Sequence, residues 1–438
     1  MKFFRNKSSF LLYLLLSAFF LYSLWALVIP FNQAPDELQR YDVANFIFRF
    51  HELPIAGDER LIYGDYGVTY ASYPYLPYIL GAFLMMIFDS IFEINNLYLV
   101  HRLISIFSGV FSVFFVYKIC EELKLEKQII YFISALFAFL PGYSFVNGYV
   151  NQDSFSICVN LFVIYCWLIG NRDEWKPKNF FLLGLGISLC LLTYLNGYIV
   201  IPITMILLLL VYLRTAKRAA FFKQLMLFFI LPIIIISGWW FLRSYILYDG
   251  DFIGLRHSKE LSENLAIESL KPSNRQTMHT LGVSLKEMLI DYRWLEITFK
   301  SFLGIFGYMD RPLPHNVYIV AIPLLTLSLL GLVSLAKNFV GRLIKYKKEA
   351  ENKLIYLLLF ALIPLAFGLS IYYSYFSDFQ AQGRYVYPAL FPIILFFCLG
   401  LREVITERLR GAVYLCIAVA MFILNIYSVL RILLPSYY

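Results

Sequence analysis

FLLYLLLSAFFLYSLWALVI at residues 10–29, followed at once by PFNQAPDE at residues 30–37, decides how this chain must fold. The first stretch has no charged residue and is about as long as a helix that crosses the ~30 Å hydrocarbon core of a bilayer. Asp36 and Glu37 then stand close to the point where that helix leaves the membrane. Carboxylates at such a position are costly to desolvate, so they indicate a functional site at this end of the helix.

The rest of the chain is apolar in the same way. Of its 438 residues, 60% are hydrophobic and 15% are charged, whereas a soluble domain carries about 25% charged residues. Further uncharged apolar runs of nearly spanning length occupy residues 155–169, 199–213, 225–241, 318–336 and 413–430. We therefore predict an all-α, multi-pass membrane protein in which residues 1–438 form a single integral membrane domain.

The net charge of +8 is explained by where the basic residues lie. If residues 10–29 cross from the cytoplasm outward, ten further spans fit near residues 100–120, 128–143, 154–170, 179–193, 196–213, 225–242, 317–336, 354–372, 386–401 and 411–432. The cytoplasmic connectors then hold clusters of Lys and Arg, and the short outer connectors 144–153 and 193–196 hold none. This positive-inside pattern predicts eleven crossings of the plasma (inner) membrane with a cytoplasmic N-terminus, and it needs no nucleic acid partner.

Two segments on the predicted outer side are long. They cover residues 30–99 and 243–316, and both are rich in polar and aromatic residues. Within the first, residues 73–88 are apolar enough to cross, but counting them as a span would move every later basic connector to the outer face. We therefore predict an interfacial or re-entrant element there, with juxtamembrane helices in an outer loop that builds a functional site.

A helix is predicted to begin near Pro35, because proline suits the first helical turn. Apolar residues then recur at helical spacing, namely Val43, Phe46, Ile47 and Phe50. At about 100° per residue, Asp36 is expected to face the bundle with this stripe and Glu37 to face water or neighbouring loops, while Arg40 lies one turn from both. The alternative is that both acids only favour a helix N-terminus electrostatically.

Cations suited to a phosphate occur on the same predicted side. Arg384, in the sequence Gln382-Gly383-Arg384-Tyr385, is the only basic residue of its outer connector. A guanidinium offers a planar fork of donors that matches phosphate oxygens, so Arg384 is the first candidate for binding one. Arg102, just inside the second predicted span, is a second candidate.

Two other outer clusters have an ordinary structural alternative. Asp153, in Asn151-Gln152-Asp153, opens the fourth predicted span and either contributes to a site or caps that helix. Arg243 follows Trp239 and Trp240 at the end of the seventh span, where Trp and Arg are also common interface anchors.

In their order along the chain, these residues resemble the GT-C superfamily of polyprenyl-phosphate-sugar-dependent glycosyltransferases. This superfamily includes protein O-mannosyltransferases and lipid A aminoarabinose transferases. The matching segments are Pro35-Asp36-Glu37, Tyr73-Pro74-Tyr75-Leu76, Arg102-Leu103, Asn151-x-Asp153, Trp240-x-x-Arg243 and Gln382-Gly383-Arg384-Tyr385. The chain is most similar to predicted bacterial membrane proteins with a Pro-Asp-Glu-x-x-His segment, although Arg40 replaces the histidine here.

The resemblance implies a GT-C-like bundle of about 11 transmembrane helices and an inverting transfer of a sugar. The donor would be a polyprenyl-phosphate sugar, and the acceptor a hydroxyl of the cell envelope on the extracytoplasmic face. Asp36 would act as general base with Glu37 as the second catalytic carboxylate. The expected substrate-binding residues are Arg384, Arg102, Arg243, Tyr385, Gln382 and Arg40. The sequence requires no cofactor, although Asp153 could help to hold a divalent metal ion such as Mg²⁺ or Mn²⁺.

Other functions fit an apolar chain of this kind. A transporter or flippase for lipid-linked saccharides needs polar residues near the centres of several spans, whereas the ionisable residues here concentrate near the ends of the spans. An O-antigen-type polymerase or ligase also has large outer loops, but the acid pair directly after the first span speaks against it. A purely structural membrane scaffold is the third alternative.

Overall fold

Helices make up most of the chain, because a helix satisfies its backbone hydrogen bonds internally, as a lipid environment demands. The computed structural model describes residues 7–343 and 350–438. The α-helices of its first half are α1 (Lys7–Val28), α2 (Glu37–Phe50), α3 (Leu76–Phe92), α4 (Leu97–Glu122), α5 (Lys127–Ala138), α6 (Pro141–Val146), α7 (Asp153–Arg172), α8 (Pro177–Leu191), α9 (Val200–Arg214) and α10 (Arg218–Gln224).

The second half continues this pattern. Its α-helices are α11 (Leu231–Leu247), α12 (Leu255–Leu265), α13 (Leu285–Ile290), α14 (Trp294–Gly304), α15 (His315–Leu343), α16 (Ala350–Phe376), α17 (Leu390–Val404), α18 (Glu407–Tyr427) and α19 (Leu434–Tyr437). Short 3₁₀ turns lie at η2 (Tyr70–Ser72), η3 (Leu195–Ile199), η5 (Glu268–Leu270) and η7 (Gly383–Ala389), and π-helical turns at η4 (Leu225–Ile230) and η8 (Ser428–Leu433). The strands β1 (Ile305–Phe306) and β2 (Arg311–Pro312) form one small antiparallel hairpin.

The long helices are those of a multi-pass membrane protein. Within the described residues, 9 helical stretches are long and apolar enough to cross a membrane. They coincide with nine of the eleven predicted spans; the other two, predicted at residues 128–143 and 179–193, fall on the shorter apolar helices α5 and α8, of 12 and 15 residues. Helix α3, of 17 residues, covers most of the apolar stretch at 73–88.

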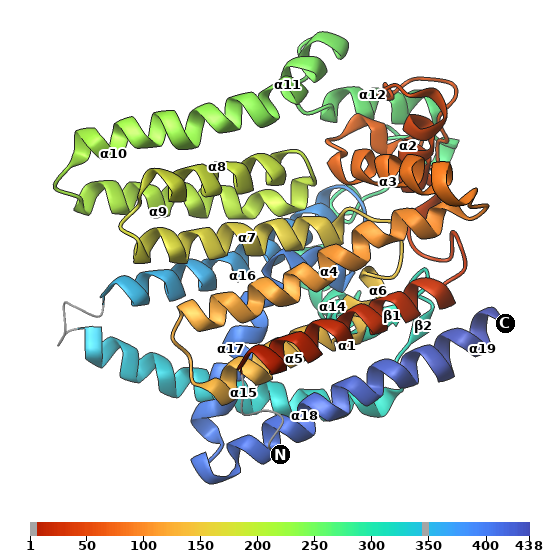
Figure 1. Cartoon of the computed structure of the whole chain (residues 1–438). Helices are drawn as coiled ribbons and strands as arrows, with labels where there is room; N and C mark the ends of the chain where they lie inside the picture. The colour runs from red at the N-terminus through yellow and green to blue at the C-terminus, as the bar shows by residue number, and fades with distance from the viewer. Residues whose placement is uncertain (1–6, 344–349) are drawn as a thin grey trace.

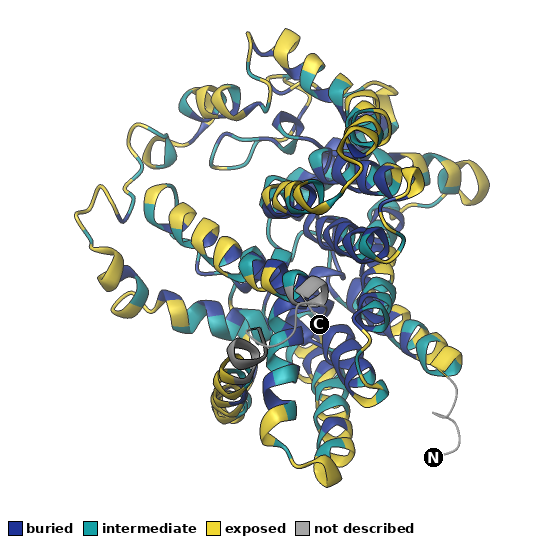
Figure 2. Ribbon diagram, turned by 90° about the vertical axis from the view of Figure 1, so that its left-hand side faces the viewer, coloured by how far each residue is buried: buried dark blue, intermediate teal, exposed yellow. Residues whose placement is uncertain are grey.

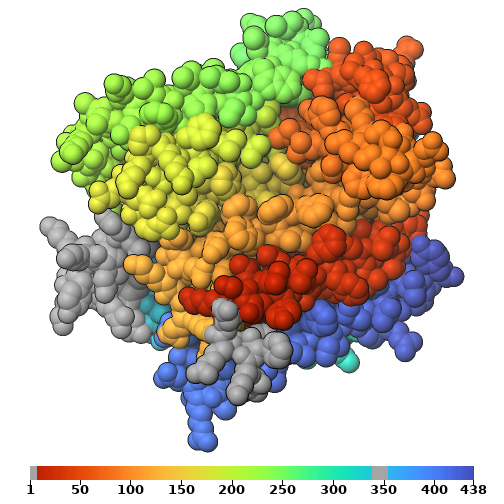
Figure 3. Space-filling model, viewed as in Figure 1, coloured from red at the N-terminus to blue at the C-terminus, as the bar shows by residue number. Residues whose placement is uncertain are grey.

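Burial follows the arrangement expected of a bundle in lipid. Figure 2 shows buried residues gathered in the middle of the molecule and exposed residues along the outer helices. Many of the exposed side chains are large and apolar, including Leu12, Leu16, Leu209, Ile235 and Leu330. Such outward apolar surface is satisfied by acyl chains rather than water. Figure 3 shows α1, in red, beside the C-terminal helices in blue, so both ends of the chain belong to one bundle.

The two long connecting segments predicted at 30–99 and 243–316 lie at the same end of the bundle. Figure 1 shows α2, α3 and α12 together at that end, and the connectors that follow α4, α7 and α9 at the opposite end. The opposite end therefore carries the basic clusters of residues 118–127, 172–178 and 214–223. The two long polar segments and the basic connectors therefore lie at opposite ends of the bundle. A site built by the polar segments lies at the end that carries α2, α3 and α12.

Close backbone contacts join the two segments. The amide of Ile267 donates to the carbonyl of Asp65 at 3.1 Å, and the Ser262 hydroxyl donates to the carbonyl of Tyr66 at 2.6 Å. Gly67 has a φ of +63°, and a Cβ there would lie 2.4 Å from the backbone nitrogen of Ala266. A glycine is therefore needed for this approach, and the two loops form one structure over the end of the bundle.

Candidate active site

Asp36 occupies an unusual backbone position at the start of α2. It is the N-cap residue of this helix, yet its φ of 60° and ψ of 17° are left-handed, and its side chain makes no capping hydrogen bond. Aspartate tolerates this region better than most residues, but a non-glycine residue there is uncommon and often marks a functional position. The side chain remains 46% exposed.

Two arginines and a tyrosine surround the Asp36 carboxylate. Its Oδ2 lies 3.5 Å from Nη2 of Arg40 and 3.6 Å from Nη2 of Arg384, and it accepts a hydrogen bond of 3.0 Å from the hydroxyl of Tyr70. Burial raises the pKa of Asp36, but Arg40, Arg384 and Tyr70 outweigh it and hold the pKa of this carboxyl below its ordinary value. Asp36 is therefore ionised at neutral pH, and in the described part of the chain its Oδ1 accepts no hydrogen bond.

Arg40 connects Asp36 to the N-terminus of α7. Its Nη1 donates to Oδ2 of Asp153 at 3.4 Å, while its Nη2 donates to Asp36 and, at 3.3 Å, to the hydroxyl of Tyr70. The guanidinium also lies over the Tyr70 ring, 4.9 Å from its centroid. The side chain of Arg40 is only 2% exposed and that of Asp153 only 4%. Arg40 is thus a buried cation held between two carboxylates.

Arg384 is positioned by the glycine before it. The amide of Gly383 donates to Oγ of Ser301 at 3.0 Å, and a Cβ at Gly383 would lie 2.2 Å from the backbone nitrogen of Phe302. Only a glycine allows η7 to pack this tightly on α14. Arg384 follows directly, with Nη1 donating to the hydroxyl of Tyr149 at 3.2 Å.

The residues after Arg384 extend the site toward the loops. Nη2 of Arg384 donates to the Tyr385 hydroxyl at 3.2 Å, and that hydroxyl donates to the side chain of Gln380. Gln380 in turn donates to Asp378 at 2.8 Å, and Tyr66 donates to the same Asp378 oxygen at 3.2 Å. A continuous polar network therefore runs from Asp36 to the joined outer loops.

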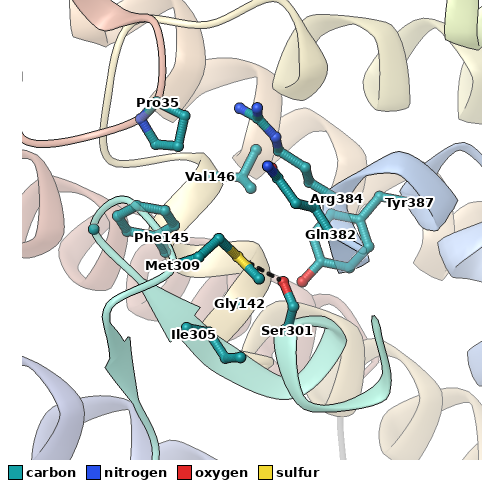
Figure 4. Close-up of a pocket in the computed structure, with 11 residues that line it drawn as sticks. Pro35, Gly142, Phe145, Val146, Ser301, Ile305, Met309, Gln382, Arg384 and Tyr387 are labelled. Atoms are coloured by element: carbon teal, nitrogen blue, oxygen red, sulfur yellow. Dashed lines mark hydrogen bonds between the residues drawn. The ribbon is translucent and has the colours of Figure 1, made fainter. Parts of the chain in front are cut away.

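A small pocket lies beside Arg384, with a volume of about 20 Å³. This is room for about one water. It is lined by residues of four segments, among them Pro35, Phe145, Ser301, Met309 and Gln382. In Figure 4, Arg384 and Gln382 extend from one wall toward Pro35. The pocket therefore places two of the predicted substrate-binding residues next to the segment that carries Asp36.

Glu37 and Arg102 form a separate, fully buried ion pair. Glu37 accepts from Nε and Nη2 of Arg102, both at 2.8 Å, and from the backbone amides of Val150 and Asn32, both at 2.9 Å. Arg102 also donates to carbonyls at and after the end of α1, those of Ala26, Ile29 and Pro30. Both side chains are 0% exposed, and their hydrogen-bonding groups are engaged with each other and with backbone atoms, so neither has a group left for a substrate. The catalytic role predicted for Glu37 and the phosphate role predicted for Arg102 are not supported by their positions.

The predicted orientation of the two acids is wrong. Glu37, expected to face water or neighbouring loops, is fully buried, whereas Asp36, expected to face the bundle, is half-exposed. The helix begins at Glu37, close to the predicted start near Pro35, but Asp36 lies before it in a left-handed conformation, so counting 100° per residue does not apply to Asp36. The apolar stripe is correct at Val43 and at the buried residues Phe46 and Ile47, but Phe50 is 44% exposed.

Some of the remaining predicted residues lie in the cluster around Asp36, and others lie outside it. Asp153 joins the cluster through Arg40, while Asn151, just before α7, accepts a hydrogen bond of 2.9 Å at Oδ1 from the amide of Ser154. Arg243 is held elsewhere, because its Nη2 donates to the carbonyls of Leu53 and Pro54 at 3.3 and 2.9 Å. The structure therefore brings together Asp36, Arg40, Asp153, Gln382, Arg384 and Tyr385, and leaves Arg243 outside the cluster.

Two tyrosines of the cluster were missed from the sequence. Tyr70 contacts both Asp36 and Arg40, and Tyr149 accepts from Arg384. The chain has 34 tyrosines, and nothing in the local sequence distinguishes Tyr70. Tyr149 stands two residues before Asn151, so its closeness to that motif was the one signal that could have indicated it.

The donor set does not match a metal centre built on Asp36 and Asp153. Within residues 7–343 and 350–438, no three His, Cys, Asp or Glu side chains lie close enough together to hold a metal ion. The space between the two carboxylates is filled by the guanidinium of Arg40. Mg²⁺ needs oxygen ligands at about 2.0–2.1 Å, and the Arg40 side chain occupies the space in which such an ion would contact both carboxylates.

Comparison with known proteins identifies both a family and a fold. A family model described as "Predicted membrane protein (DUF2142)" matches residues 47–395. No curated protein matches the sequence. Among solved structures, the chain is similar to the oligosaccharyltransferase of Archaeoglobus fulgidus in its apo form, with a TM-score of 0.53 and 15% identity over 97% of this chain and 56% of that one.

Two further structures are similar. The same oligosaccharyltransferase tethered to an acceptor peptide containing the NVT sequon gives a TM-score of 0.53, with 16% identity over 98% of this chain and 56% of that one. ArnT from Cupriavidus metallidurans bound to undecaprenyl phosphate gives a TM-score of 0.48, with 12% identity over 98% of this chain and 74% of that one. The chain spans little more than half the length of the oligosaccharyltransferase. The likeness to that protein shows a GT-C-like fold, as the sequence resemblance predicted.

Proposed function

Because this chain belongs to the DUF2142 family of predicted membrane proteins and has a GT-C-like fold, we propose that it is a membrane glycosyltransferase. Its donor is a sugar carried on a polyprenyl phosphate, and its acceptor is a hydroxyl of the cell envelope. The observation that supports this proposal is the direct contact between Asp36 and Arg384, whose Oδ2 and Nη2 lie 3.6 Å apart; we assign the carboxylate as the base and the guanidinium as the phosphate-binding cation.

The proposed reaction is a single displacement at the anomeric carbon. Asp36 takes the proton of the acceptor hydroxyl through the free Oδ1, and the acceptor oxygen forms a bond to the anomeric carbon. The bond from that carbon to the phosphate oxygen breaks, and the phosphate keeps the electron pair. Arg384 stabilises the negative charge that develops on the departing phosphate. The configuration at the anomeric carbon is inverted.

Tyrosines around the cluster are suited to a sugar. Tyr70 and Tyr194 are half-buried, and burial raises the pKa of both hydroxyls well above the ordinary value. The charges of Asp36 and Asp153 respectively act on them in the same direction. A tyrosine offers an apolar ring face together with a polar hydroxyl, which matches the apolar ring faces and hydroxyl edges of a saccharide.

The basic connectors support an extracytoplasmic site in the plasma (inner) membrane. They lie at the end of the bundle opposite α2, the helix that Asp36 precedes, and cytoplasmic connectors are the ones enriched in Lys and Arg. The site then faces outward, beside the leaflet from which a lipid-linked donor enters. The cell envelope on that side supplies the acceptor.

The position of the ionisable residues favours an enzyme over a transporter or flippase. In the described spans, Arg102, Asp153 and Arg384 all lie within the first six residues of their helical stretches. Arg384 contacts Asp36 directly, Asp153 is connected to it through Arg40, and Arg102 binds the neighbouring Glu37. A conduit for a polar saccharide needs such groups along its path through the membrane. Because these ionisable residues lie together at one end of the bundle, they support a reaction at that end rather than movement of a saccharide through the membrane.

Transfer from radiolabelled polyprenyl-phosphate sugars in isolated membranes tests the proposal. Membranes that contain the chain are expected to move label from the lipid into an aqueous or envelope fraction for at least one donor sugar. Membranes without the chain provide the background. Equal label transfer by both preparations, over a panel of hexose and pentose donors, would contradict the proposed function.

Replacing Arg384 with glutamine is expected to weaken donor binding and to move the acid limb of the pH–rate profile upward. Asp36 is active when ionised, so kcat/KM falls as pH falls through its pKa. That pKa lies below the ordinary value of about 3.9 for aspartate, and removal of a neighbouring cation raises it. The profile of kcat/KM reports the free enzyme. An acid limb at the same pH in Arg384→Gln and wild type would contradict the coupling of these two residues.

A further inference from the structure

We propose that Arg40 is the built-in cation of this site, occupying the place between Asp36 and Asp153 where a divalent metal ion would otherwise bridge two carboxylates, so that the reaction needs no metal. The statement that the reaction needs no metal rests on the proposed transferase function. The statement that Arg40, and not a metal ion, lies between the two carboxylates can be measured separately.

The contacts of Arg40 are those of a bridging cation. One terminal nitrogen, Nη1, lies 3.4 Å from Asp153, and the other, Nη2, lies 3.5 Å from Asp36. The two carboxylates come from different parts of the chain, one before α2 and the other at the start of α7. Without a positive charge between them, two carboxylates sharing a buried site would repel each other.

Arg40 has little freedom to give way to a metal ion. Its side chain is 2% exposed, its guanidinium lies over the ring of Tyr70, and the Tyr70 hydroxyl accepts from Nη2. A metal ion bound to both carboxylates would lie within a few ångströms of the guanidinium. The guanidinium of Arg40 already occupies the position between the two carboxylates that a bridging metal ion would need, and these contacts hold it there.

Arg40 also leaves a donor for a substrate. Its Nε is buried, and among the described residues it has no hydrogen-bond partner; the same is true of Nε of Arg384. Nη2 atoms of both arginines contact the same oxygen of Asp36, so the two guanidinium groups are neighbours. Buried donors without acceptors are costly, and an anionic ligand with several oxygens, such as a phosphate ester, would supply acceptors for them.

Binding of Mn²⁺ to the purified full-length protein tests the structural part. Titration followed by electron paramagnetic resonance is expected to show no saturable Mn²⁺ site in the wild type that depends on Asp153. Wild type and Asp153→Asn should therefore give the same curve. A saturable site in the wild type that disappears in Asp153→Asn would overturn the inference, whether or not the protein transfers a sugar.

Removal of the Arg40 side chain, and its replacement by added guanidinium ions, tests whether this cation contributes to catalysis. Arg40→Ala is expected to lose about 10²-fold or more in transfer rate, the loss typical of one preorganised electrostatic group. Added guanidinium ions should restore part of that rate. Arg60→Ala, which removes an exposed arginine of the same outer segment, is the matched control and should transfer normally and show no effect of guanidinium.

Chelation distinguishes metal-independent from metal-dependent transfer in the wild-type enzyme. Wild-type transfer is expected to be the same with and without EDTA. Loss of transfer with EDTA and its return with Mn²⁺ would overturn the inference while leaving the glycosyltransferase function intact. If the wild type transfers no sugar from any donor, the proposed function fails, and the Mn²⁺ titration still decides the role of Arg40.

Discussion

Replacement of Asp36 with asparagine is expected to lower the rate of sugar transfer by about 10²–10⁴-fold, the range contributed by a general base. Asparagine keeps the shape of the side chain and an oxygen that can accept from Tyr70, but it cannot take a proton from the acceptor hydroxyl. The side chain is 46% exposed, so the change should leave the fold intact. Turnover is measured with purified protein and a synthetic polyprenyl-phosphate sugar.

Asp65→Asn is the matched control for this experiment. Asp65 is an exposed aspartate of the same outer segment, so this variant should retain wild-type turnover. The midpoint of thermal unfolding should be similar for the wild type and both variants. Near-normal turnover by Asp36→Asn would remove Asp36 from the role of base. A fall in turnover that is matched by Asp65→Asn would point instead to a general effect on the loop.

Replacement of Glu37 with alanine is expected to have the largest effect on stability. Glu37 makes two hydrogen bonds to Arg102 and accepts from two backbone amides, all in a buried environment. Removing one partner of a buried ion pair costs about 3–5 kcal/mol, because the other charge is left uncompensated. The variant should unfold at a clearly lower temperature in detergent and accumulate poorly in membranes.

Two further variants make this prediction specific. Glu52→Ala removes one partner of a surface ion pair with Arg60, in which both side chains are about half exposed, and such pairs contribute little to stability. It should unfold close to the wild-type temperature. In the double variant Glu37→Ala/Arg102→Ala no charge is left unpaired, so it should be destabilised by less than the sum of the single changes. Additive losses would show that the pair is not coupled.

The membrane architecture was predictable because it depends on averages along the chain. Runs of apolar residues and clusters of Lys and Arg are local properties, and each constrains where a helix can cross. The nine long stretches in the described residues match predicted spans for this reason. Helix α5 is shorter than its predicted span at 128–143, because helix ends are set by individual turns, such as the one at Phe139 after α5, that average hydropathy does not resolve.

The choice between Asp36 and Glu37 was not predictable in the same way. The sequence indicated an acid pair after the first span, but a single residue with positive φ decided which acid faces the cluster. Arg102 illustrates the same limit. Its position just inside a span is as consistent with a buried partner for Glu37 as with a phosphate ligand, and only the three-dimensional contacts distinguish them.

The convergence of distant residues was predictable in part. Asp36, Asp153 and Arg384 were each proposed from local patterns, and the structure connects them through Arg40 and Oδ2 of Asp36. The contributions of Tyr70 and Tyr149 depend on how η2 and the turn before α7 pack against these residues. No local pattern encodes such packing, because tyrosine is common throughout this chain.

The anomeric configuration of the product is the most direct test of the proposed reaction. Purified protein is given a polyprenyl-phosphate sugar of known configuration and a hydroxyl acceptor, and the product is examined by nuclear magnetic resonance. Deprotonation of the acceptor by Asp36 and attack in one step predict that the configuration is inverted. A product that retains the configuration of the donor would contradict the assignment of Asp36 as the general base of a single displacement.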